Sequence, residues 1–186
     1  MLNIIFIGPP GSGKGTQSIK IAKYLNLNHI NMGNILRSEI KNNSINEGFL
    51  LSDNIISNIL REKIKTNSKY IFDGVPRNIC QYNILKTILR DYKQKIDILF
   101  YIQLKKENII ERISKRMSID NRIDDKNINS INNRINEFYI KTLPIIQYCQ
   151  SDLEVHNING NKSIDNVYNN IITIINNKLS SIINAN

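Results

Sequence analysis

The sequence predicts an α/β fold in which five parallel strands form a doubly wound sheet with helices on both faces. Two observations lead to this prediction. Short apolar runs of strand length alternate with longer segments whose apolar residues recur at helical spacing. The first run, LNIIFI, is almost continuously apolar and ends at Gly8, which is typical of a strand buried on both faces. The 186 residues suffice for one domain, 1–186, with small inserted segments.

Each element follows from its local pattern. The predicted strands cover residues 2–7, 27–31, 70–74, 96–104 and 153–158. The predicted helices cover residues 14–25, 33–42, 52–65, 79–92, 106–116 and 127–149, the last with a bend at Pro144, and a final helix follows Ser163. Ser52 and Ser163 are suitable N-cap residues. Residues 117–125 are polar, and we expect them to be irregular.

Composition limits the classes of function. A hydrophobic content of 41% and a charged content of 22% are ordinary for a soluble globular protein. No apolar run reaches the ~20 residues that span a bilayer, and no basic leader precedes the first strand, so we expect a cytoplasmic location. The net charge of +9 indicates an anionic partner. Because the arginines occur singly, without a basic cluster interleaved with aromatics, small polyphosphates are favoured over nucleic acid.

The stretch GPPGSGKGTQ, residues 8–17, has the features of a phosphate-binding loop. Its glycines let several backbone N–H groups point inward, and the following helix adds its positive N-terminal end. Lys14 supplies a mobile charge for the β- and γ-phosphates, and Thr16 a hydroxyl near phosphate or magnesium. Gly15 stands where Ser or Thr usually follows the lysine. The candidate phosphate-binding residues are Gly11, Ser12, Gly13, Lys14, Gly15 and Thr16.

Loops of this form resemble those of the nucleoside monophosphate kinases, above all the adenylate kinases, in which the lysine is followed by Gly and then Thr. The resemblance covers nearly the whole chain, and the motifs fall in the family's order. It implies a P-loop kinase fold with a small flap for the nucleoside monophosphate, about 31–51, and a short lid, about 116–125. It further implies reversible, magnesium-dependent transfer between ATP and AMP to give two ADP, by a monomer that acts on nucleotides and not on nucleic acid or membranes.

On the acceptor side, NMGNILR (31–37) resembles the family segment S-T-G-D-x-x-R. Arg37 would bind the α-phosphate of the monophosphate through its planar fork. Met32 and Asn34 depart from the family pattern, since Thr and Asp are usual there, and Met32 takes the position that helps to receive the base. Leu50 and Leu51 match the segment whose backbone contacts AMP, although the flap is shorter than usual near 43–47.

The stretch FDGVPRNICQ (72–81) resembles the family motif D-G-[FY]-P-R-x-x-x-Q. Asp73 ends a buried strand, where a carboxylate is costly unless it serves a ligand, and it would hold magnesium through water. Gly74 and Arg77 would lie at the acceptor phosphate. Gln81 offers a donor and an acceptor for the edge of adenine.

The donor lid is implied by ERISKRMSIDNRIDD (111–125). Arg112 would lie along the donor adenine and Arg116 near its phosphates, while Arg122 and Arg134 would complete the cluster around the transferring group. The backbone near Lys162 would pass the donor adenine. This is the short form of the lid, without the Cys-bearing insertion that binds zinc in some members. Cys80 and Cys149 form no C-x-x-C pair, so no zinc is expected.

Three alternatives stay open at this point. Asn78 resembles the form found in UMP/CMP kinases, whereas Gln81 favours AMP. The short flap, Met32 and Asn34 would also suit a degenerate module that binds nucleotides without transfer. The basic charge would suit a nucleic-acid-binding P-loop protein, although the sequence has no continuous basic helix.

Overall fold

The computed structural model describes residues 2–41, 52–120, 125 and 127–184, and side chains within these ranges except at 40, 41 and 118–120. Its five strands are β1 (Ile4–Ile7), β2 (Asn28–Asn31), β3 (Tyr70–Asp73), β4 (Ile98–Gln103) and β5 (Val155–Asn159). They form one sheet in the order β2-β3-β1-β4-β5, and every pair is parallel. The predicted fold class is thereby confirmed.

Helices follow the strands in the alternation expected of a parallel sheet. They are α1 (Lys14–Leu25), α2 (Met32–Lys41), α3 (Asp53–Lys63), α4 (Ile79–Asp91), α5 (Lys106–Asp120), α6 (Ile128–Glu137), α7 (Pro144–Cys149) and α8 (Ile164–Asn184), with a π-helical turn η2 (Phe138–Thr142). No helix among the residues described has the length and apolar character needed to cross a membrane.

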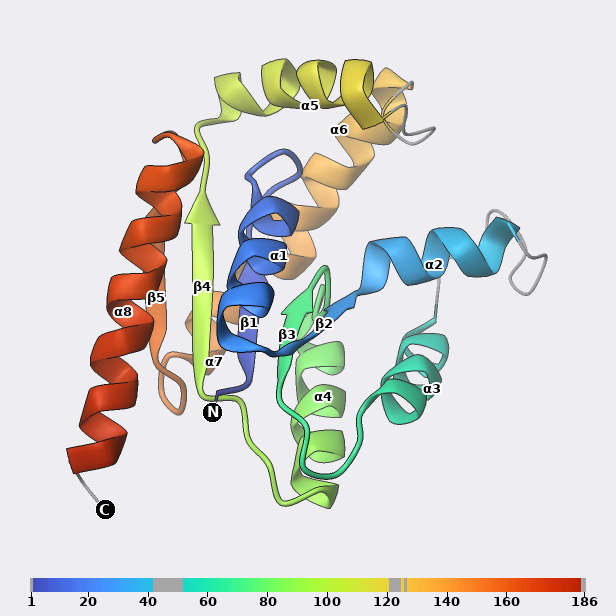
Figure 1. Cartoon of the computed structure of the whole chain (residues 1–186). Helices are drawn as coiled ribbons and strands as arrows, with labels where there is room; N and C mark the ends of the chain where they lie inside the picture. The colour runs from blue at the N-terminus through green and yellow to red at the C-terminus, as the bar shows by residue number, and fades with distance from the viewer. Residues whose placement is uncertain (1, 42–51, 121–124, 126, 185–186) are drawn as a thin grey trace.

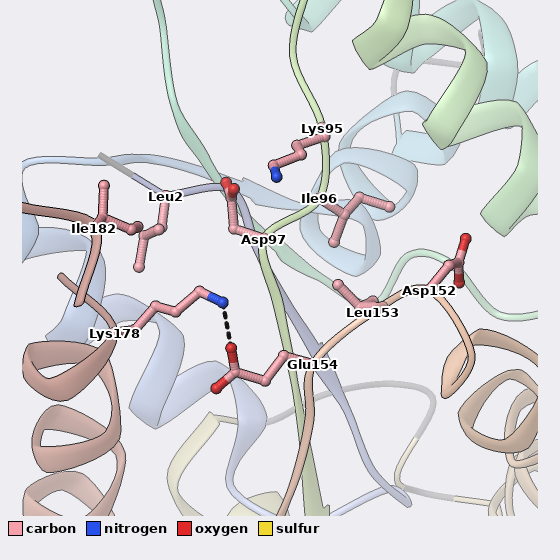
Figure 2. Close-up of a pocket in the computed structure, with 9 residues that line it drawn as sticks. All are labelled: Leu2, Lys95, Ile96, Asp97, Asp152, Leu153, Glu154, Lys178 and Ile182. Carbon is pink, nitrogen blue, oxygen red and sulfur yellow. Dashed lines mark hydrogen bonds and ion pairs between the residues drawn. The ribbon is translucent and has the colours of Figure 1, made fainter. Parts of the chain in front are cut away.

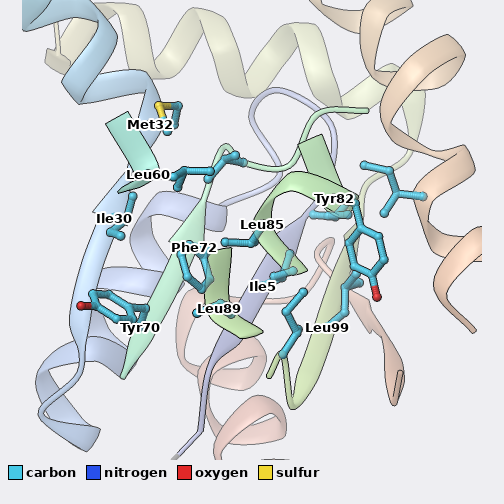
Figure 3. Close-up of a cluster of buried hydrophobic side chains, with 14 of the residues drawn as sticks. Ile5, Ile30, Met32, Leu60, Tyr70, Phe72, Tyr82, Leu85, Leu89 and Leu99 are labelled. Carbon is cyan, nitrogen blue, oxygen red and sulfur yellow. The ribbon is translucent and has the colours of Figure 1, made fainter. Parts of the chain in front are cut away.

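Alternating residues of the strands pack on opposite faces of the sheet. Ile5 and Ile7 of β1 belong to a large cluster with side chains of α3, α4 and α7 (Figure 3). Ile4 and Phe6 belong to a second cluster with α1 and α8. Both faces of the sheet are therefore covered, which explains the continuous apolar run of β1.

Three helices, α2, α5 and α6, lie near the carboxyl end of the sheet (Figure 1). Figure 1 shows α5 and α6 above this end, while α2 reaches out to one side. α5 and α6 have their own small core, in which Ile109 and Ile113 meet Ile131 and Ile135. The carboxyl ends of parallel strands are where ligands bind in such sheets.

Two predicted elements differ from the structure. α5 continues to Asp120, through part of the segment 117–125 that we expected to be irregular. The segment SKRMSID (114–120) is polar but has neither Gly nor Pro, so nothing in it opposes a helix. The predicted helix 127–149 is divided into α6, η2 and α7. Because Pro144 lacks an N–H, the helix changes its pattern before it, and Leu143 N–H donates to Phe138 O five residues back at 2.8 Å.

Candidate active site

The glycine-rich loop joins β1 to α1, as the sequence predicts. Gly13 has φ +95°, a backbone conformation that favours glycine, and α1 begins directly after it. The Nζ atom of Lys14 bends back over the loop and donates to Gly8 O at 2.6 Å and to Pro9 O at 2.9 Å. The lysine charge is thus held above the loop, where a phosphate chain would lie.

The electrostatic surroundings of Lys14 combine burial with neighbouring cations. Burial and the charges of Arg77, Arg116 and Arg134 together lower the pKa of Lys14 to about 8, against the opposing effect of Asp73. Three arginines that are far apart in the sequence therefore act on one ammonium group. This is the environment expected at a site for a polyanion.

Asp73 ends β3 and is 5% exposed. Its Oδ2 accepts from Asn31 Nδ2 at 2.6 Å and from Ser18 Oγ at 3.3 Å. His29 Nε2 lies 3.7 Å away, which is too far for a direct hydrogen bond. Burial alone would raise the pKa of Asp73, but His29, the Lys14 charge and Ser18 hold it below its usual range. Asp73 is therefore an ionised carboxylate beside the loop.

Arg116 and Arg134 converge on Asp125. Arg116 donates to it through Nε at 2.8 Å and Nη2 at 2.7 Å, and Arg134 donates through Nη1 at 2.8 Å. The side chain of Asp125 has no exposed area. Burial raises the pKa of this carboxyl, but both guanidinium groups hold it below its usual range. One carboxylate thus fixes two arginines from α5 and α6 beside each other.

α5 also touches the loop directly. A β carbon added at Gly11 would lie 3.3 Å from Ile109 O and 3.4 Å from Arg112 Cβ. On the other side, a β carbon at Gly160 would lie 2.6 Å from Gln103 O and 3.3 Å from Ser12 O. The loop that contains Lys162 therefore packs against the glycine-rich loop.

The residues predicted for the acceptor lie in the segment after β3 and on α2. Arg77 Nε donates to Gly74 O at 3.1 Å, and Gly74 itself has φ +77°. Arg37 Nη2 donates to Asn34 Oδ1 at 2.6 Å. Met32 is only 1% exposed and its side chain belongs to the core cluster, and its contact with the base stays a prediction.

Gln81 is engaged at both ends of its amide. Its Oε1 accepts from Arg77 N at 2.8 Å, and its Nε2 donates to Asp53 Oδ1 at 2.9 Å. Asn78 is the N-cap of α4, because its Oδ1 accepts from Gln81 N at 2.7 Å, and its Nδ2 also donates to Asp53 at 3.1 Å. This capping explains Asn78 without reference to a pyrimidine base.

Comparison with known proteins identifies the family. A family model described as adenylate kinase matches residues 6–153. The chain belongs to the adenylate kinase family. It is 35% identical to an adenylate kinase of Porphyromonas gingivalis, over 94% of this chain and 96% of that protein. It is 36% identical to one of Azobacteroides pseudotrichonymphae, over 95% and 98% of the two chains, and 30% identical to one of Flavobacterium psychrophilum, over 95% and 100%.

Membership of the adenylate kinase family confirms the predicted class of enzyme, a P-loop phosphotransferase, and does not favour the UMP/CMP kinase reading. Some predicted contacts remain predictions. Arg122, Leu50 and Leu51 lie outside the described residues, as does the short stretch of flap near 43–47. Within the described residues, no three His, Cys, Asp or Glu side chains gather into a metal-binding group.

Two side chains of the candidate site were not found from the sequence. Asp53, at the start of α3, binds both Asn78 and Gln81, and Asn31 binds Asp73. The signals available for Asn31 were its place at the start of the motif NMGNILR and the N-cap preference of Asn, but the predicted helix began at residue 33, whereas α2 begins at Met32.

A surface pocket lies away from this site. Figure 2 shows its lining, which includes Leu2, Asp97 and Glu154. These residues precede β1, β4 and β5, so the pocket is at the amino-terminal end of the sheet. The pocket and the glycine-rich loop therefore lie at opposite ends of the strands.

Proposed function

We propose that the chain catalyses reversible phosphoryl transfer, ATP + AMP to 2 ADP, at the carboxyl end of its sheet. The observation that carries this proposal is the set of arginines that act on Lys14: Arg77 from the segment after β3, Arg116 from α5 and Arg134 from α6. Phosphoryl transfer needs positioning and charge neutralisation more than an acid or a base. A cluster of cations from three separate elements supplies both.

On the donor side, the backbone of Gly11–Thr16 and the N-terminal end of α1 would bind the phosphates of ATP. Lys14 would exchange the carbonyls of Gly8 and Pro9 for phosphate oxygens, which are stronger, charged acceptors. Arg116 would reach the phosphates while Asp125 keeps its orientation. Arg112 and the backbone at Lys162 would border the donor adenine, and Arg122 would join the cluster.

Mg²⁺ fits the residues beside the loop. Among the described residues, the side-chain hydrogen bonds of Asp73 all end on Oδ2, which leaves Oδ1 to accept from a metal-bound water. Thr16, an exposed residue in the first turn of α1, offers a hydroxyl. When bound with ATP, magnesium would neutralise part of the charge of the phosphates. Asp73 and Thr16 would hold its water shell.

On the acceptor side, Arg37 and Arg77 would bind the phosphate of AMP, with Gly74 leaving room beside them. The amide of Gln81 is hydrogen-bonded to Arg77 N and to Asp53. Gln81 would therefore have to release Asp53 before it could hydrogen-bond to the edge of adenine. We further propose that the protein works as a monomer in the cytoplasm on ATP, AMP and ADP.

The test is a coupled assay of ADP formation with AMP, CMP and UMP as alternative acceptors. We expect AMP to be preferred, and Lys14→Ala to lose transfer by a factor of about 100 or more, since one lost donor of this kind costs ~3 kcal/mol. A preference for CMP or UMP would reject AMP as the acceptor. ATP binding without ADP formation from any acceptor would reject the enzyme itself.

A further inference from the structure

The hydrogen bonds of Asn31 join the two sides of the site. Asn31 is the last residue of β2, and in the sheet it is paired with Asp73, the last residue of β3. Its Nδ2 donates to Asp73 Oδ2 at 2.6 Å, and its Oδ1 accepts from the backbone N–H of Asn34 at 2.8 Å. One amide group therefore holds both a carboxylate beside the glycine-rich loop and the first turn of α2.

The contact with α2 has the geometry of an N-cap. Asn31 directly precedes Met32, the first residue of α2, and an N-cap oxygen normally accepts from the N–H of the third helical residue, which here is Asn34. The side chain of Asn34 continues the connection, since its Oδ1 accepts from Arg37 Nη2 at 2.6 Å. The path from Asp73 to Arg37 thus runs through two asparagines.

Little space surrounds this path. A β carbon added at Gly33 would lie 3.4 Å from both terminal nitrogens of Arg37 and 3.5 Å from Asn31 Oδ1. The backbone N of Gly33 would in turn lie 3.6 Å from a β carbon at Gly74. The first turn of α2 is therefore closely fitted to the segment that follows β3.

Asn31 differs from the other neighbours of Asp73 Oδ2. Ser18 on α1 donates to it at 3.3 Å, and His29 lies 3.7 Å away. The Asn31 bond is shorter than both, and of these three residues it is Asn31 whose side chain also bonds to α2.

We infer that Asn31 is a positioning residue that sets Asp73 and Arg37 relative to each other. The inference rests on the proposed function for the roles of these two residues, magnesium binding for Asp73 and AMP phosphate binding for Arg37. Asn31 bonds directly to Asp73 and acts on Arg37 through Asn34, so its loss alters the magnesium dependence and the AMP affinity together.

Two variants separate the two hydrogen bonds. Asn31→Ser keeps an oxygen that can cap α2 but is too short to reach Asp73, whereas Asn31→Leu removes both bonds. For both variants, the Mg²⁺ concentration for half-maximal activity should rise about 10-fold or more, as is typical when a partner of a metal-binding group is lost. The KM for AMP should stay within about twofold in Asn31→Ser and rise about fivefold in Asn31→Leu, the effect of one lost N-cap.

The matched control is Asn28→Ser, on the same strand. Asn28 is exposed, and its side chain makes a long 3.4 Å contact with Lys69 O, away from the site. Thermal unfolding of all variants shows whether they are folded. If folded Asn31→Ser and Asn31→Leu match Asn28→Ser in magnesium dependence, the link to Asp73 is wrong. If they match each other in KM for AMP, the link to α2 is wrong.

A further measurement separates this inference from the proposed function. If the unaltered chain forms no ADP, the proposed function fails, and the arrangement around Asn31 is then judged by hydrogen exchange of the Asn34 amide, followed by NMR. We expect this amide to exchange slowly in the unaltered chain and in Asn31→Ser, and about fivefold faster in Asn31→Leu. Equal rates in all three proteins would overturn the inference without reference to activity.

Discussion

The low pKa of Lys14 makes ATP affinity depend on pH in a range where few groups titrate. With a pKa of about 8, the ammonium of the ligand-free protein is about 90% protonated at pH 7 and about 10% at pH 9. A bound triphosphate favours the protonated form, because an opposite charge raises the pKa of a lysine. Binding above pH 8 must therefore include the uptake of a proton.

The expected loss follows from these fractions. If the pKa of Lys14 in the complex lies well above 9, the affinity for ATP falls about 10-fold between pH 7 and pH 9, about twofold up to pH 8 and about fivefold from pH 8 to pH 9. Isothermal titration calorimetry with ATP at pH 7, 8 and 9, in buffers of different ionisation enthalpy, measures both the affinity and the proton uptake.

Lys14→Arg is the control for this titration, because a guanidinium stays charged throughout the range. Its affinity for ATP should be weaker than that of the unaltered chain at pH 7 but should change little up to pH 9. An affinity of the unaltered chain that is constant from pH 7 to pH 9 would refute the argument. So would an equal decline in Lys14→Arg, since the titrating group would then lie elsewhere.

Three further predictions concern the frame of the site. Gly160→Ala places a methyl group 2.6 Å from Gln103 O, so the segment at residue 160 must shift against the glycine-rich loop on which it packs. Calorimetry should therefore show weaker ATP binding and unchanged AMP binding. Asp125→Asn should lower the free energy of unfolding at neutral pH. The same variant should also lose less stability in acid than the unaltered chain. Because the pKa of Asp125 is lowered in the folded chain, its carboxylate stabilises the fold above the pKa of an unfolded aspartate, and this stabilisation is lost as the pH falls through the pKa of the folded chain. Leu85→Ala, at a fully buried core position, should cost about 3 kcal/mol in urea unfolding.

Features with a strong local signal were predictable from the sequence. The run LNIIFI indicates a strand covered on both faces, and β1 has core clusters on both of its faces. The glycine-rich loop follows that strand and precedes a helix, as its phosphate-binding pattern requires. In each case the pattern depends on neighbouring residues alone.

Contacts between distant segments were not predictable in this way. The sequence presents Gln81 as a reader of adenine, yet the fold places its amide between Arg77 N and Asp53, which is 28 positions away. Met32 is similar, since its burial depends on how α2 meets β3. Propensity and periodicity carry no information on such pairings, which arise only when the elements have packed.

The cations of the site differ in how strongly the protein itself holds them. Lys14 donates to two backbone carbonyls, whereas Arg116 and Arg134 donate to the ionised carboxylate of Asp125. Charge-assisted bonds to a carboxylate are stronger than bonds to a neutral carbonyl. A phosphate chain should therefore displace the partners of Lys14 and leave Asp125 in place. Since a guanidinium has five N–H donors, an arginine can hold Asp125 and a phosphate oxygen together, and of these three cations Lys14 is the one that has to change its partners.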